Sequence, residues 1–326
     1  MAEVRHNASS LPLSRSGLSV ASWLRRLRTA SATERREWLL AFCLLLPAAV
    51  MLSLFMAYPF VRGIWLSLTN TVVGQVGTFI GLQNYVILWH DDIFRRAAAN
   101  TFIYTAVATI LKLALGMVVA LMMNNLLGFK RILRASMLLP WIVPTVLSAL
   151  AWKWMIDPTF SILNWIMYQL GVIRFRVDWL GGPVTAMVSV ILVNVWRGMP
   201  FFAITLLAGL QTVNPEVLEA ATIDGATALQ RFWKVTWPLM MPITMVVVLF
   251  SVVMTFADFQ LVYILTGGGP TNSTHLFATY AYQLSIATAK LGEGAAASLA
   301  MFPFLFLVVL FQLWYVRCGE GGKGEA

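Results

Sequence analysis

Six long apolar segments constrain this chain more than any other feature of its sequence. They cover residues 38–60, 97–123, 135–156, 185–210, 239–262 and 294–316. A helix needs about 20 mostly apolar residues to cross the hydrocarbon core of a bilayer. In lipid every backbone N–H and C=O group must be hydrogen-bonded within the protein, so an apolar segment that crosses the bilayer on its own is expected to be a helix. The sequence therefore predicts an all-α polytopic membrane protein with six transmembrane helices.

The overall composition agrees with a membrane protein. Of the 326 residues 59% are hydrophobic and only 11% are charged, whereas a soluble domain has about 25% charged residues. A formal net charge of +9 would suggest a nucleic-acid partner in a soluble protein. In a membrane protein it indicates the excess of basic residues on the cytoplasmic side. We therefore expect membrane lipid around the chain and no nucleic acid.

The distribution of basic residues predicts the orientation. If the N-terminus is cytoplasmic, the cytoplasmic segments hold fourteen of the 23 Lys and Arg residues, the outer segments six and the spans three. Seven of the fourteen lie in residues 1–37, and basic residues near the ends of spans tend to stay in the cytoplasm. We expect a basic cytoplasmic tail at 1–37, a transmembrane domain at 38–316 and a short cytoplasmic tail at 317–326.

The loop 211–238, between the fourth and fifth spans, has the features of a short capped helix. Asn214 can cap its start, and Pro215 occupies the first helical position, where a proline is tolerated. Gly225 suits the left-handed end of a helix, and Thr227 can begin a second one. Most connections between spans are short, so a capped helix pair indicates a role beyond joining two spans.

This loop resembles the EAA loop of the membrane subunits of binding-protein-dependent ABC importers. The family pattern is Glu-Ala-Ala, three residues, Gly, nine residues, Ile, one residue, Leu-Pro. The residues in register are Glu219, Ala220, Ala221, Gly225 and Pro238. Val235 and Trp237 depart from the pattern, and both keep an apolar side chain.

Four further segments resemble the carbohydrate-uptake branch of these importers, the maltose and glycerol-phosphate permease type. They are Gly-Leu-Gln-Asn-Tyr at 81–85, Leu-Pro-Trp-Ile-Val-Pro at 139–144, Trp-Lys-Trp-Met at 152–155 and Leu-Thr-Gly-Gly-Gly-Pro at 265–270. The glycine run could let a partner's backbone approach closely, or it could be a plain turn. The residues alone leave both interpretations open.

The resemblance implies an importer-type ABC permease fold in a bacterial inner membrane. It implies an unlike second permease subunit, a cytoplasmic ATP-binding cassette ATPase dimer and an extracytoplasmic solute-binding protein that delivers a sugar or polyol. The chain has no phosphate-binding loop of the pattern Gly-x-x-x-x-Gly-Lys-Ser/Thr, so ATP would bind to a partner and we expect no cofactor here. The residues expected to couple to the ATPase are Glu219, Ala220, Ala221, Asp224 and Gly225.

Polar residues within or near the spans are the candidates for the solute path. Charged groups are costly in hydrocarbon and usually face a cavity or a partner. The candidates are Asn194, Arg197, Asp258, Phe259 and Gln260. The alternative is a structural role, for example an ion pair between Arg197 and Asp258. Lys112, near the middle of the second span, has the same two interpretations.

Other activities are weakly supported. His90 lies beside Asp91 and Asp92, but no further ligand has suitable spacing, so we expect a solvated loop and no metal. A membrane enzyme acting on lipid would need an acid–base cluster, and the chain has only three His residues. An ion-coupled secondary transporter is the main alternative. It would show inverted repeats and paired broken helices, which the sequence does not reveal.

Overall fold

The computed structural model describes residues 32–125 and 130–321. Within these ranges the chain is helical apart from loops and two isolated β-bridges between residues 69 and 79, which confirms the all-α class. The basic tail predicted at 1–37 lies outside the described residues as far as residue 31, and residues 32–37 begin a helix. The described residues form two compact units, which divide between Val61 and Arg62.

The first unit consists of helix α2, Ala32–Leu52, followed by a π-turn at Ser53–Ala57 and the start of α3, Tyr58–Ser67. The continuous helix is apolar enough to cross a membrane between Arg36 and Ser67. It therefore extends seven residues beyond the predicted end at residue 60. A second π-turn occupies Phe232–Thr236. Both of these π-turns are followed two residues later by a proline, whose missing N–H disturbs the regular hydrogen-bond pattern, whereas a third π-turn at Gln283–Ala287 has no proline there.

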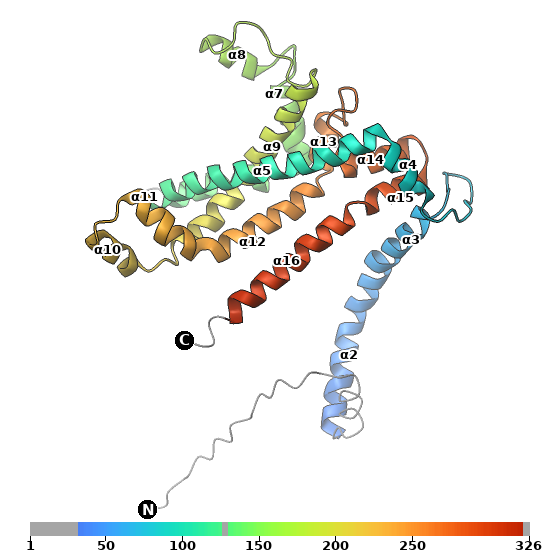
Figure 1. The fold of residues 1–326 in the computed structure, drawn as a ribbon, viewed down its shortest axis with the longest axis horizontal. Helices are drawn as coiled ribbons and strands as arrows, with labels where there is room; N and C mark the ends of the chain where they lie inside the picture. Colours follow the sequence, from blue (N-terminus) through green and yellow to red (C-terminus); the bar gives the residue numbers. More distant parts are fainter. Residues whose placement is uncertain (1–31, 126–129, 322–326) are drawn as a thin grey trace, which may run out of the picture. The chain divides into compact units, whose positions relative to one another are not determined.

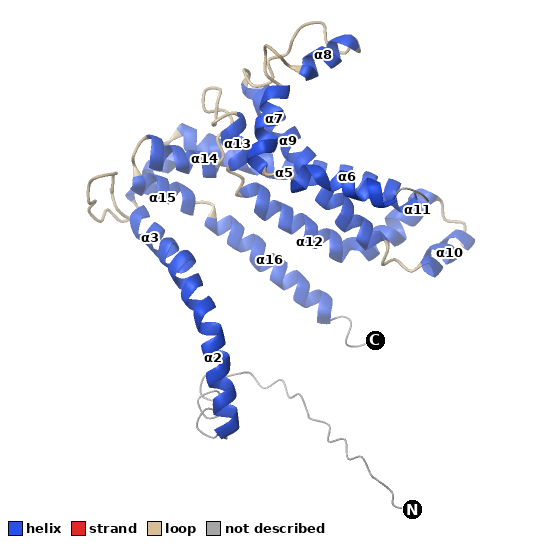
Figure 2. Cartoon of the chain, turned by 180° about the vertical axis from the view of Figure 1, so that it is seen from behind, coloured by secondary structure: helices blue, strands red, loops and turns tan. Residues whose placement is uncertain are grey.

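Three long helices form the centre of the second unit (Figures 1 and 2). They are α5, Asp92–Asn125, α9, Pro183–Leu210, and α12, Trp237–Phe256. The contact between α5 and α9 is the most extensive in the molecule. A Cβ added at Gly116 of α5 would lie 2.6 Å from the Cβ of Phe202 on α9. The missing side chain therefore allows the close helix approach on which membrane bundles depend.

The third apolar segment, predicted as one span at 135–156 that prolines interrupt, is sharply bent. Helix α6, Lys130–Ile142, and helix α7, Thr145–Met155, meet at an angle of 94°. Pro144 lacks an N–H and disfavours the helical conformation in the residue before it, which explains the bend. Among the described residues, five helices are long and apolar enough to span a membrane, and six if the bent pair is one span. After α7, a loop with helix α8, Ile162–Gln169, leads to α9.

The fifth span ends earlier than the predicted residue 262. Helix α12 stops at Phe256, and a separate helix α13, Gln260–Leu265, follows after three residues. Asp258 lies in this break, and its Oδ1 accepts the backbone N–H of Leu261 at 3.4 Å. A side-chain oxygen that bonds a nearby N–H competes with the regular helical pattern, so the sequence continues as a new helix.

A group of short helices packs at the end of the second unit that carries α13. They are α4, Gln83–His90, α14, Phe277–Tyr282, and α15, Leu291–Leu299. The long helix α16, Phe302–Gly321, follows α15. Phe94, Phe256, Phe277 and Tyr280 form the aromatic part of their shared core. The hydroxyl of Tyr280 also donates to Asp91, which therefore takes part in the packing of these helices.

The glycine run at 265–270 forms a tight, internally bonded turn. Thr274 Oγ1 lies 2.7 Å from both Thr266 Oγ1 and the carbonyl of Gly269. A Cβ added at Gly268, whose φ is +93°, would lie 2.1 Å from the ring of His275. His275 is buried, and burial lowers the pKa of its imidazole. Close packing within the chain therefore explains why residue 268 is a glycine, as the interpretation of the run as a plain turn requires.

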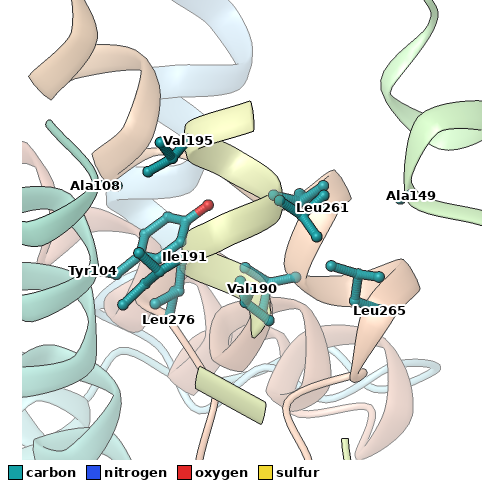
Figure 3. Packing of buried hydrophobic residues seen from close by; sticks show 11 residues of the cluster. Tyr104, Ala108, Ala149, Val190, Ile191, Val195, Leu261, Leu265 and Leu276 are labelled. Atoms are coloured by element: carbon teal, nitrogen blue, oxygen red, sulfur yellow. The ribbon is translucent and has the colours of Figure 1, made fainter. Parts of the chain in front are cut away.

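A buried cluster joins α5, α7, α9 and α13 (Figure 3). Tyr104 of α5 lies beside Ile191 of α9, and Leu261 and Leu265 of α13 lie near Val190. Because Leu261, Val262 and Leu265 belong to this cluster, it fixes the position of α13 against α9. The hydroxyl of Tyr104 is the polar atom at the edge of this apolar group.

We expect Gly116→Ala to destabilise the protein. Alanine favours a helix over glycine by about 1 kcal/mol, but here its methyl group would overlap Phe202, and overpacking costs about 1–3 kcal/mol. The unfolding temperature in detergent should fall. Gly63→Ala is the matched control, because a Cβ at Gly63 meets nothing within 4 Å. Equal unfolding temperatures for the two variants would contradict the close α5–α9 contact.

Candidate functional site

A cavity of about 590 Å³ lies among α5, α6, α7, α9, α12 and the break after α12. All five residues predicted for the solute path line it, together with Lys112. They are Asn194 and Arg197 from α9, and Asp258, Phe259 and Gln260 from the break and the first residue of α13. The break therefore brings together residues that are more than 60 positions apart in the sequence.

Asp258 is the centre of the polar contacts at this cavity. Its Oδ2 accepts a hydrogen bond from the Tyr104 hydroxyl at 2.7 Å and another from Asn194 Nδ2 at 3.1 Å. Its Oδ1 faces the amide of Leu261. The carboxylate thus connects α5, α9 and α13 through three donors that carry no charge, and hydrogen bonds to a charged acceptor are stronger than those between neutral groups.

Arg197 lines the same cavity but does not pair with Asp258. Among the described residues, the salt bridges join Arg95 to Asp92 and Lys290 to Glu293. The Nε of Arg197 is buried and has no hydrogen-bond partner. The ion pair that we considered as the structural alternative is therefore not formed, and the guanidinium needs another explanation.

Lys112 reaches the cavity from the middle of α5. Its side chain is 4% exposed, and its Nζ donates to Thr255 Oγ1 of α12 at 2.8 Å. The Nζ also lies 6.0 Å from the centre of the Phe202 ring. Gly198 makes room for the aliphatic stem, since a Cβ there would lie 2.6 Å from Lys112 Cδ. The ammonium group has polar contact with one neutral hydroxyl.

Aromatic rings form much of the remaining wall. Trp141 and Phe201 stack at 5.7 Å with 17° between their planes, and Phe250 lies 5.2 Å from Phe201. Phe259 stacks on Tyr263 at 5.0 Å. A wall of ring faces, two amides and charged groups suits a ligand with both apolar faces and polar edges.

Sequence reasoning found the cavity's polar lining but missed Tyr104. A tyrosine in an apolar span gives no local signal of its partner, and its hydrogen bond to Asp258 joins residues 154 positions apart. Trp141, Phe201 and Phe250 were also missed, because aromatic residues at helical spacing usually serve packing. Only the bend between α6 and α7 and the crossing with α9 place them at one cavity.

The predicted capped helix pair is present between the C-terminal end of α9 and the start of α12. Helix α10 covers Pro215–Ile223, and Asn214 Oδ1 accepts the Glu216 N–H at 3.0 Å. Gly225 has a φ of +79°, with bonds from Ala226 N to Ala221 O and from Gly225 N to Thr222 O. This is the Schellman arrangement that ends many helices.

Helix α11, Ala228–Arg231, starts with a capping box between Thr227 and Gln230 and continues into α12. Arg231 Nη1 donates to Thr222 Oγ1 at 3.1 Å and to the carbonyl of Ala226 at 3.3 Å. Leu218 packs against the buried cluster that includes Leu210, Val213 and Met240. These contacts hold α10, α11 and the membrane helices together as one stiff element.

The surface of this helix pair is open and partly apolar. No residue of α10 is buried; Ile223 is 87% and Leu229 69% exposed. Of the predicted coupling residues, Glu219, Ala220, Asp224 and Gly225 are exposed, and Ala221 is half-buried. A stiff helix pair with exposed apolar and acidic side chains has the properties of a protein-docking surface.

The comparisons with known proteins agree with this geometry. Residues 112–317 match the family described as binding-protein-dependent transport system inner membrane component. The trehalose/maltose transport system permease protein MalF of Thermococcus litoralis is 34% identical over 89% of this chain and 97% of its own length. The sulfoquinovosyl glycerol permease protein SmoG of Agrobacterium fabrum is 33% identical over 86% and 91%.

A solved structure gives the same fold. A bacterial ABC transporter involved in the import of the acidic polysaccharide alginate has a chain that aligns with a TM-score of 0.74. The alignment covers 91% of this chain and 98% of that one at 24% identity. The expected importer-type fold is therefore confirmed, and a secondary transporter and a lipid enzyme are both excluded by the family match. The chain belongs to the family of inner-membrane components of binding-protein-dependent transport systems, and it is a multi-pass importer permease, not an enzyme.

Proposed function

We propose that this chain is one of two unlike permease subunits of an ABC importer for a sugar or polyol. The two subunits would enclose the solute path, an extracytoplasmic binding protein would deliver the solute, and a separate ATPase dimer would drive transport. The observation that supports this most directly is the pairing of a polar, aromatic-lined cavity with a stiff, exposed helix pair in one helical unit. Relatives named for trehalose, maltose and sulfoquinovosyl glycerol transport support the carbohydrate class.

We assign the coupling function to α10 and the turn that follows it. Glu219, Ala220 and Ala221 would contact the ATPase on α10, and Asp224 and Gly225 would set the turn. The alanines keep that face shallow, so the helix can enter a groove. Leu218 and Arg231 connect α10 to the membrane helices, so a rotation of α10 would be passed to α9 and α12 as a rigid-body movement.

We assign the solute path to the cavity. Asn194 and Gln260 carry amides that can donate to and accept from sugar hydroxyls, while Phe259 and the stacked Trp141–Phe201 pair offer ring faces. Both termini and the α10–α11 pair would be cytoplasmic, as the distribution of basic residues predicts. The residues of the cavity would bind, orient and release the solute.

Gly225→Val is expected to reduce uptake by at least tenfold, because a β-branched residue is strained by about 1–3 kcal/mol in the left-handed conformation that the Schellman turn requires. A Cβ at Gly225 meets nothing within 4 Å, so the backbone is the sole cause. Gly225→Asn should retain more uptake, since asparagine tolerates this conformation. Measurements of uptake and of solute-stimulated ATP hydrolysis in reconstituted complex test both variants.

If Gly225→Val and Gly225→Asn transport equally well, the turn has no coupling role. Co-purification of the other subunits with each variant is the accompanying control. It separates loss of coupling from loss of assembly.

Ile223→Cys is expected to react with a membrane-impermeant thiol reagent only from the cytoplasmic side, because Ile223 is 87% exposed on the proposed cytoplasmic helix pair. Labelling of inside-out and right-side-out vesicles measures this, in a chain from which Cys43 and Cys318 have been removed. Addition of the ATPase should protect the thiol.

Phe160→Cys, in the loop before α8 and 85% exposed, is the matched control and should react from the opposite side. Reversed or identical sidedness would refute the orientation.

A further inference from the structure

The charged residues of the cavity do not balance. Three of its sixteen lining residues are charged: Lys112, Arg197 and Asp258. Two of them are cations and one is a carboxylate, so the cavity has a formal excess of one positive charge. In a space of low dielectric constant such an excess acts strongly on any ligand that enters.

The carboxylate forms no direct ion pair with either cation. Asp258 receives hydrogen bonds from the Tyr104 hydroxyl, the Asn194 amide and the Leu261 backbone, and all three donors are neutral. It forms no salt bridge with Arg197 or Lys112, since the salt bridges among the described residues lie elsewhere. The carboxylate oxygens of Asp258 are therefore used in the hydrogen bonds that join α5, α9 and α13.

Both cations retain unused donors. A guanidinium has five N–H groups and an ammonium three. The Nε of Arg197 is shielded from solvent and has no partner, and the buried Nζ of Lys112 donates to one hydroxyl, that of Thr255. A buried charge is costly unless it is paired and hydrogen-bonded. Two such cations at one cavity lack the anion that would stabilise them.

We propose that this cavity selects solutes in which a hydroxyl-rich body carries an anionic group: a carboxylate, a phosphate or a sulfonate. This rests on the proposed function and names the chemical class of its solute. Arg197 binds the anion, for which its planar fork is suited, and Lys112 adds a second positive charge. Asn194 and Gln260 contact hydroxyls, and the Trp141–Phe201 stack covers a face of the ring.

The proposal can be tested without knowing the natural solute, by measuring the electrostatic field in the cavity. Met254 lines the cavity and is 59% exposed, so Met254→Cys, in a chain without Cys43 and Cys318, places one thiol there. The assembled importer in membrane vesicles is treated from both sides with an anionic and a cationic thiosulfonate of similar size. The rate of labelling with the anionic reagent is divided by the rate with the cationic reagent, and this ratio is then divided by the same ratio measured for a small free thiol.

The normalised ratio should favour the anionic reagent by on the order of tenfold. Arg197→Gln should abolish most of this preference, Arg197→Lys should preserve it, and Asp258→Asn should increase it. Phe160→Cys, outside the cavity, should give a ratio that Arg197→Gln leaves unchanged. Lys112→Gln keeps the test decisive if Arg197→Gln does not assemble, because it removes the other positive charge and should also lower the preference.

Matched solutes test the chemical class directly. Glucuronate should slow labelling of Met254→Cys at least fivefold more than glucose at the same millimolar concentration, and glycerol 3-phosphate more than glycerol. Chloride at equal ionic strength should protect far less, which separates a solute site from simple screening.

Three results would overturn the proposal: a ratio that favours the cationic reagent, equal protection by charged and neutral members of each pair, or a thiol that neither reagent reaches. A carboxylate supplied by the second permease would produce the first result. If the proposed function itself were wrong, the observation would be a different one. The chain would then not co-purify with an ATPase and a second permease, whatever the charge preference of the cavity.

Discussion

The hydrogen bonds to Asp258 are the interaction on which the arrangement of the second unit depends. A carboxylate within an apolar bundle is stable only if its oxygens find donors, and each unsatisfied buried group costs about 1–3 kcal/mol. Tyr104 and Asn194 supply those donors from two other helices. The same carboxylate interrupts the fifth span, so one residue both ends α12 and fixes α13 against α5 and α9. The cavity exists because the helix breaks there.

The cavity and the α10–α11 pair are carried by the same helices. The cavity is lined from the middle of α9 and the C-terminal end of α12, and the α10–α11 pair lies between the C-terminal end of α9 and the start of α12 (Figure 1). The Schellman turn at Gly225, the capping box at Thr227 and the bonds of Arg231 leave the pair little internal freedom. A force applied to α10 would therefore move the helices and would not be absorbed by a flexible loop. Physical continuity of stiff elements is what a coupling role requires.

The cavity combines two properties that the proposed solute path would use. Its aromatic wall and amides suit a hydroxyl-rich solute, while Lys112 and Arg197 give it a charge that Asp258 leaves unpaired. Removing an unpaired charge from a membrane bundle would normally stabilise it. The proposed anionic solute would use both cations, which would link the electrostatics of the bundle to the selection of solute.

The sequence by itself determined the features that depend on neighbouring residues. Long apolar runs predicted the helices, because lipid demands internal backbone bonding. Asn214, Gly225 and Thr227 predicted the capped pair, because capping acts within four or five residues. Only the tertiary structure decided the rest: the 94° bend before α7, the break around Asp258, and which polar groups meet. Tyr104 and Asn194 are 154 and 64 positions from Asp258, and bonds over such separations follow from helix packing, which hydropathy and spacing do not specify.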